Sequence, residues 1–279
     1  MKENLDKFKI STMCRMLKVK RSGFYAWQRR PKSKRKIENE ALLEKIKEIF
    51  QKKKKIYGYP RITNALPEDM KVSEGRVYRI MKANGLKSKT ARKYKPQTTD
   101  SKHNLPVAEN ILNREFSAEK PCQKWVSDIT YIETEEGFLY LAGILDLYDK
   151  SVVGWSMQTH MKKELVIGAL NQAIGRFRPS AGLLLHSDRG SQYCSNEYQK
   201  IIKNNGFICS MSRKGNCWDN APMESFWGKL KSEWLCDMKF KTVEEAKAAV
   251  FEYIEIFYNR DRLHSSNGYM PPCQKRKAA

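Results

Sequence analysis

The first third of the chain has the hydrophobic spacing of short amphipathic helices. Apolar residues recur every three or four positions, the period of a helix that buries one face. This spacing is found in four stretches: 10–28, 37–53, 60–66 and 74–84. Within the first stretch, two short helices joined by a basic turn indicate a helix-turn-helix in 1–30, with a plain helical hairpin as the alternative. The other three predict a second helical, helix-turn-helix-like DNA-binding domain over 37–86.

After residue 124 the pattern becomes that of alternating strands and helices. Strands are expected at 124–133, 138–147, 151–158, 183–185 and 207–211, and helices at 162–176, 195–205, 222–237 and 242–258. Tight turns between the first three strands predict an antiparallel meander. The whole order predicts an α/β fold over 124–279, a mixed five-stranded sheet flanked by helices. Residues 87–123 are basic and turn-rich, which predicts a linker with one short helix near 111–116.

Charge is concentrated in the predicted helical region. The chain has 279 residues and a formal net charge of +22, and residues 1–100 hold 29 of the 53 Lys and Arg against 10 of the 31 acidic residues. A basic arm ahead of a nearly neutral body favours binding to nucleic acid. A basic surface that only aids solubility is the alternative.

The cysteine pattern and the lack of long apolar runs indicate where in the cell the protein is expected. The seven cysteines are scattered without a Cys-x-x-Cys pair, which argues against a structural zinc site and for reduced thiols. The N-terminus lacks the apolar core of a signal peptide, and no apolar run approaches the ~18 residues of a membrane span. We therefore expect a cytoplasmic protein with no membrane partner.

Three cations share one face of the helix predicted over 74–84. Arg76, Arg79 and Lys82 are spaced by three, and the apolar residues of the helix lie on another face. A helix that enters a DNA groove needs an apolar back and a cationic front that reaches phosphates or guanine edges. An ordinary solvated face is the alternative.

Three carboxylates lie in or next to the predicted strands and helices of the second region. Asp128 lies in the middle of a strand, Asp188 follows a buried strand, and Glu224 lies in the first turn of a helix. If the fold brings them together, they repel one another unless protons or cations intervene, and Mg²⁺ accepts such oxygen ligands. Two ions about 3.5–4 Å apart would support an in-line phosphoryl transfer. Taken singly, each acid has a structural alternative: a hydrogen-bonded group in a strand, or a partner for the helix dipole.

Lys231 follows Glu224 by seven residues on the same predicted helix. At about 100° per residue both project along one edge of the apolar stripe. This geometry lets Lys231 reach a DNA phosphate two helical turns away from Glu224, with a solvated lysine as the alternative.

The three motifs together resemble a known signature. Their segments are 125–131, 185–193 and 220–227, and 35 residues separate Asp188 from Glu224. With Lys231 they resemble the DDE signature of retroviral-integrase-type transposases, and almost the whole chain resembles the orfB-type catalytic proteins of frameshifting bacterial insertion sequences. The resemblance implies a ribonuclease-H-like core whose first strand neighbours the fourth. It also implies Mg²⁺ or Mn²⁺, in two ions, held by Asp128, Asp188 and Glu224, with Lys231 on DNA.

The same resemblance implies the partners and the reaction. The partners are double-stranded DNA at element ends and target, further copies of the chain on that DNA, and an upstream orfA-type product or fusion, because this chain starts shortly before the first helix. The expected location is the bacterial cytoplasm, on the nucleoid. The reaction is cleavage at element ends and attack of the freed 3′-hydroxyl on new phosphodiesters. The alternatives are a hydrolytic nuclease of the same fold and a DNA-binding regulator with an inert core.

Overall fold

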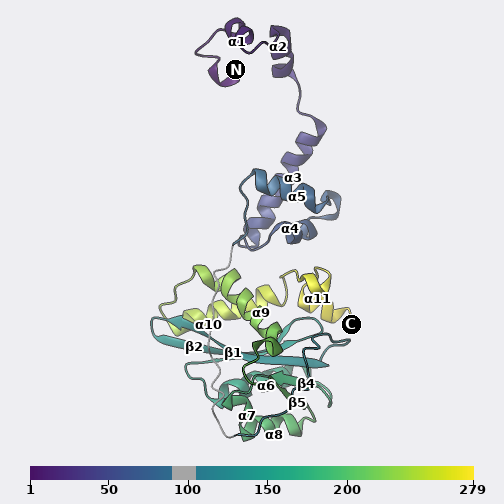
Figure 1. Cartoon of the computed structure of the whole chain (residues 1–279), viewed down its shortest axis with the longest axis vertical. Coiled ribbons are helices and arrows are strands. Elements are labelled where there is room, and N and C mark those ends of the chain that lie inside the picture. The colour runs from purple at the N-terminus through teal and green to yellow at the C-terminus, as the bar shows by residue number, and fades with distance from the viewer. Residues whose placement is uncertain (90–104) are drawn as a thin grey trace. The chain divides into compact units, whose positions relative to one another are not determined.

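The computed structural model describes residues 1–89 and 105–279 (Figure 1). The chain divides into two compact units, Met1–Lys87 and Ser88–Ala279. Part of the linker predicted over 87–123 lies at 90–104, outside the described residues.

The first unit is helical, as its hydrophobic spacing predicts. Its α-helices are α1 (Ile10–Met16), α2 (Arg21–Arg29), α3 (Lys34–Lys52), α4 (Tyr59–Ala65) and α5 (Glu74–Ala83), with 3-10 turns at Lys2–Asn4 and Glu68–Met70. Ile46, Ile62 and Val77, one from each of α3, α4 and α5, are fully buried. The apolar face of α5 is therefore turned inward, and its polar face remains available to solvent.

The second unit is built on a five-stranded mixed sheet, which confirms the predicted fold class. The strands are β1 (Lys124–Thr134), β2 (Gly137–Asp146), β3 (Val152–Gln158), β4 (Leu184–Ser187) and β5 (Ile208–Met211). Their order across the sheet is β3-β2-β1-β4-β5. The first three form the predicted antiparallel meander, whereas β4 runs parallel to both β1 and β5.

Helices cover both faces of this sheet (Figure 1). The helices are α6 (Lys163–Phe177), α7 (Ser191–Cys194), α8 (Asn196–Asn204), α9 (Ala221–Lys229), α10 (Val243–Phe251) and α11 (Pro272–Lys277). In the view of Figure 1, α6, α7 and α8 lie below the sheet, and α9 and α10 lie above it. Leu165, Ala169 and Ala173 of α6 join a buried apolar cluster with β1, β2 and β3 residues.

Two predicted helices continue through π-helical turns. The helix predicted over 222–237 is α9, then a π turn at Leu230–Trp234 and a 3-10 turn at Leu235–Asp237. The final helix begins at a Thr242–Glu245 capping box and becomes π-helical over Glu252–Tyr258. The π turns pack against each other, because the Trp234 ring stacks on Phe257 at 5.2 Å between centroids.

The prediction of a short helix near 111–116 is wrong. The segment is irregular, and the backbone N–H groups of Ile111 and Leu112 both donate to the Ser210 hydroxyl oxygen of β5. The Met211 N–H also donates to the Glu109 carbonyl. These bonds to a distant strand replace the bonds that a local helix would make. The helices α7 and α11 had no counterpart in the sequence prediction.

Substitutions at two glycines of the second unit can test how closely α6 packs on the sheet. A Cβ on Gly154 of β3 would lie 2.7 Å from the Ala173 Cβ and would overlap the Ala169 carbonyl, whereas a Cβ on Gly175 of α6 meets no atom within 4 Å. We expect Gly154→Ala to lower the free energy of unfolding by about 1–3 kcal/mol, the usual effect of overpacking. The matched Gly175→Ala should raise it by up to about 1 kcal/mol, because alanine favours the helix.

The measurement is urea denaturation followed by tryptophan fluorescence. Equal stability of the two variants would show that β3 and α6 are not held as close together as described.

Candidate active site

Parallel pairing of β1 with β4 brings two of the three predicted acids to the same level of the sheet. The last paired residues are Val126 and His186. Asp128 follows Val126 by two residues and therefore projects to the same face of β1, and Asp188 follows His186 by two residues. Asp188 lies just past the end of β4, where its carboxylate accepts a hydrogen bond from the Gly190 N–H at 2.9 Å.

The two aspartates interact strongly. Burial and, next, the charge of Asp188 raise the pKa of Asp128 to about 8, and Glu224 adds a smaller effect in the same direction. Two opposing contacts are the N–H of Ile129 and the indole of Trp227, whose Nε1 donates to Asp128 Oδ2 at 3.1 Å. Burial and the neighbouring charge thus disfavour ionisation of Asp128, and a proton or cation between the two carboxylates would relieve the repulsion.

Glu224 lies nearby but is not gathered into the pair. It is an exposed residue in the first turn of α9, and partial loss of water raises the pKa of its carboxyl group. Among residues 1–89 and 105–279, no three His, Cys, Asp or Glu side chains lie close enough together to hold a metal ion. The structure thus presents an aspartate pair with a third acid within electrostatic range.

Trp227 and Gly143, which sequence reasoning missed, position Asp128. Gly143 of β2 is the register partner of Asp128. A Cβ on Gly143 would lie 2.8 Å from the ring of Trp227, so the missing side chain makes room for the indole that reaches Asp128. A glycine inside a nearly all-apolar strand was the available signal, because it often marks a close approach.

Asn220 joins the start of α9 to β1. Its side-chain Nδ2 donates to the Ser127 carbonyl at 3.0 Å, and the Ser127 hydroxyl donates in turn to the Gly143 carbonyl at 3.1 Å. These buried bonds hold the helix that carries Glu224 against the strand that carries Asp128.

Lys231 lies at the edge of the same site. Its ammonium is 5.0 Å from the centre of the Tyr131 ring of β1, a cation–π distance. Burial lowers the pKa of Lys231 to about 8, although the charge of Asp128 opposes that effect. Glu224 and Lys231 were predicted to project along one edge of a regular helix. The π turn at Leu230–Trp234 changes that spacing, and Lys231 lies against Tyr131 of β1.

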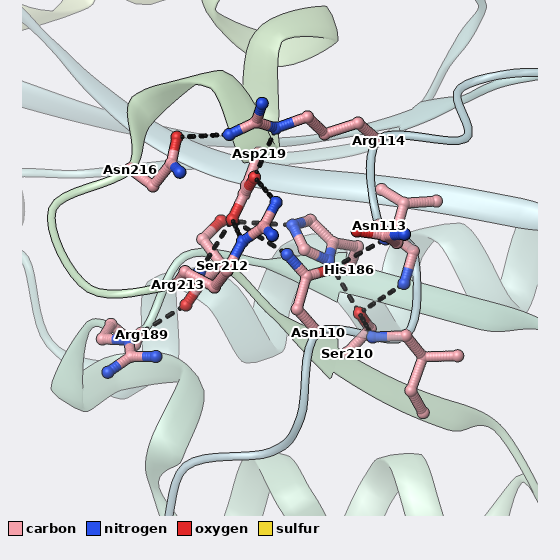
Figure 2. A network of polar contacts seen from close by, with 12 residues as sticks. Asn110, Asn113, Arg114, His186, Arg189, Ser210, Ser212, Arg213, Asn216 and Asp219 are labelled. Atoms are coloured by element: carbon pink, nitrogen blue, oxygen red, sulfur yellow. Dashed lines mark hydrogen bonds and ion pairs between the residues drawn. The ribbon is translucent and has the colours of Figure 1, made fainter.

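His186 of the second motif is a structural residue. It is fully buried, with Nδ1 2.8 Å from the Ser210 hydroxyl and Nε2 3.1 Å from the Ser212 hydroxyl (Figure 2). Burial lowers its pKa to about 4, so the ring is neutral at pH 7 and supports the strand ends that precede Asp188.

Comparison with known proteins identifies the family of this chain. The profile of the integrase core domain matches residues 118–217 and a second integrase core profile matches 205–272, whereas an HTH-like domain profile matches 37–94. A 31 kDa uncharacterized protein of insertion element IS600 from Shigella sonnei is 47% identical over 95% of this chain and 97% of its own length. The transposase InsF of insertion sequence IS3A from Escherichia coli is 42% identical over 96% and 93%. This chain belongs to the insertion-sequence transposases with an integrase core.

Solved structures with similarity to the transposase include a chain of the simian T-cell lymphotropic virus intasome in complex with PP2A regulatory subunit B56 gamma. That match has a TM-score of 0.48 and 17% identity, and covers 79% of this chain and 70% of the other. The HTLV-2 integrase catalytic core in complex with magnesium matches with a TM-score of 0.45 and 18% identity over 57% and 99%.

The C-terminal polar residues of the transposase buttress its core. Asn259 accepts from the Val152 N–H and donates to the Val152 carbonyl, both at 2.9 Å. Arg262 is almost fully buried and forms a bidentate ion pair with Glu233 of the π turn that carries Lys231. No helix in the described part of the transposase is long and apolar enough to cross a membrane.

The three cations predicted on α5 differ in their surroundings. Arg76 is half-buried and donates to Asn39 at 2.9 Å and to Glu38 at 3.1 Å, both on α3. Arg79 and Lys82 are exposed. Arg79 donates to the Gly75 carbonyl one turn earlier at 3.0 Å, and Lys82 lies over the Tyr78 ring at 5.8 Å. Arg76 therefore ties α5 to α3, and the other two face solvent.

Proposed function

We propose that Asp128, Asp188 and Glu224 are the metal ligands with which this transposase cleaves DNA at the ends of its element and joins the freed 3′-hydroxyl to a new phosphodiester. The observation that carries the proposal is the aspartate pair, in which each carboxylate raises the energy of the other's charge. A protein that keeps two such groups together gains from a cation that binds both.

The donor set fits Mg²⁺ or Mn²⁺. Carboxylate oxygens are hard ligands, and Asp128, Asp188 and Glu224 are the residues that would hold the ions. When bound, two such ions would activate the attacking hydroxyl and stabilise the leaving oxygen. The Trp227 N–H donates to one oxygen of Asp128 and so helps to orient the carboxylate. Lys231 offsets the charge of a DNA phosphate beside Glu224.

The partners follow from this chemistry. The substrate is double-stranded DNA, the element end and then the target, and joining two ends requires at least two copies of the chain on that DNA. We propose that the upstream orfA-type product supplies further contacts to the element end. DNA of this kind places the transposase at the nucleoid, in the bacterial cytoplasm.

The helical unit supplies the end-binding surface, and α5 is its groove-facing helix. Replacing both Arg79 and Lys82 with alanine should weaken binding to an element-end duplex and reduce the slope of log K against log salt by about 1 for each DNA phosphate that the variant no longer binds. The matched control is Lys47→Ala, an ion-paired lysine on α3. Arg76→Ala should lower the stability of the helical unit, because it removes the ion pair between α5 and Glu38 of α3.

Binding is measured by fluorescence anisotropy across a salt series. If the double variant keeps the salt slope of the wild type, α5 does not face DNA.

Strand transfer tests the chemistry. A labelled duplex that ends in the element's terminal inverted repeat is incubated with the transposase and its upstream product, in Mg²⁺ or EDTA. The wild type should produce joined strands only with Mg²⁺, and Glu224→Gln should lower joining by at least about a thousandfold, because it removes a metal ligand. The matched Glu244→Gln changes an exposed, ion-paired glutamate of α10 and should retain full activity.

Other outcomes would favour the alternatives. Cleavage without joining would favour a hydrolytic nuclease, and end binding without any cleavage would favour a regulator with an inert core.

A further inference from the structure

We propose that Asp219 is a positioning residue that sets how far Glu224 lies from the aspartate pair. The inference rests on the proposed metal role of Glu224, and extends it to a carboxylate that touches neither metal nor DNA. Asp219 lies two residues before the start of α9 and five before Glu224. Its placement therefore fixes the origin of the helix that presents the third acid.

Asp219 is the fully buried centre of a polar network (Figure 2). Its carboxylate accepts hydrogen bonds from Arg213 through the backbone N–H at 2.9 Å and through the guanidinium at 2.9 and 2.7 Å. It also accepts from Arg114 at 2.8 Å and from Asn110 at 2.9 Å. Hydrogen bonds from Arg213 hold the pKa of Asp219 well below its usual range, so the group is a permanent anion at neutral pH.

These donors come from two directions. Arg213 follows β5 and is bound by Asp219, six positions later, so the pair closes the loop that contains Gly215 and leads into the 3-10 turn Cys217–Asn220, where Trp218 is exposed. Arg114 and Asn110 belong to the segment ahead of β1, and Arg114 also donates to Asn216 of the loop at 2.9 Å. The segment itself is fixed to β5 through the Ser210 hydroxyl. The loop end is therefore held from both sides.

The network connects directly to the site. The residue after Asp219 is Asn220, which donates to the carbonyl of Ser127 beside Asp128. Anchors on two successive residues fix both the position and the direction of the first turn of α9. Glu224 lies in this turn, and it does not form a preformed metal site with the two aspartates. A small shift of the turn therefore changes the distance from Glu224 to the aspartate pair.

The contacts of the Asp219 carboxylate restrain its partners strongly because the carboxylate is buried. A fully desolvated carboxylate with two guanidinium partners has a narrow range of favourable geometries, and loss of one partner leaves a buried charge underpaired. An anchor that served stability alone would also fit these contacts. The two roles differ in one measurable respect, because only a positioning role changes the affinity of the acids for a divalent ion.

The test measures Mn²⁺ binding to the full chain by the electron paramagnetic resonance signal of the unbound ion, at a temperature where circular dichroism shows each variant folded. We expect Asp219→Asn to weaken Mn²⁺ binding about tenfold or more, as is typical when a residue that orients a metal ligand is changed. Affinity for an element-end duplex should remain within about twofold of the wild type. Arg114→Met, which leaves Arg213 on the carboxylate, should give a smaller change in the same direction and covers the case in which Asp219→Asn fails to fold.

The matched control is Asp237→Asn, the same exchange at an exposed carboxylate paired with Lys89, and it should bind Mn²⁺ like the wild type. Glu224→Gln separates this inference from the proposed function. If Glu224→Gln weakens Mn²⁺ binding while Asp219→Asn and Arg114→Met leave it unchanged, the positioning role is overturned and the metal site stands. If Glu224→Gln itself leaves Mn²⁺ binding unchanged, the proposed metal site is overturned, and the positioning role with it.

Discussion

Repulsion between Asp128 and Asp188 is the constraint around which the second unit is arranged. Parallel pairing of β1 with β4 ends at Val126 and His186, two residues before each aspartate, and so brings the two carboxylates to the same edge of the sheet. Partial burial strengthens the repulsion, because less water is present to screen the charges. A divalent ion held by the two carboxylates would relieve this unfavourable energy.

The side of the sheet occupied by α9 supplies the remaining groups. Gly143 leaves a space on β2, Trp227 fills it and reaches Asp128, and Asn220 fastens the helix start to Ser127. The π turn after α9 then directs Lys231 to Tyr131 of β1. Each contact joins α9 to β1 or its neighbour. Side-chain contacts at both ends of α9 and along it therefore position this helix, whereas Asp128 lies on a strand of the sheet and Asp188 just past the end of one.

Sequence reasoning identified the strands and most helices of the second unit because each has its own hydrophobic period. The three acids could be grouped from their motif spacing, although their individual patterns also fit structural roles. The irregular segment at 111–116 was predicted as a helix because its bonds go to Ser210, almost a hundred residues away, where no local pattern indicates them. The π turns were missed for a similar reason, since the mutual packing of Trp234 and Phe257 is a tertiary contact. Arg76 shares its spacing with Arg79 and Lys82, yet only the fold shows that it binds Glu38.

The most direct test of the central claim is to locate the ion itself. Crystals of the transposase grown with Mn²⁺ and measured at the manganese absorption edge would give an anomalous peak for each bound ion. We expect the strongest peak between the carboxylates of Asp128 and Asp188, and its loss in Asp128→Asn. Mn²⁺ bound elsewhere, with no peak at this pair under conditions that support strand transfer, would contradict the assignment of these residues as the metal site.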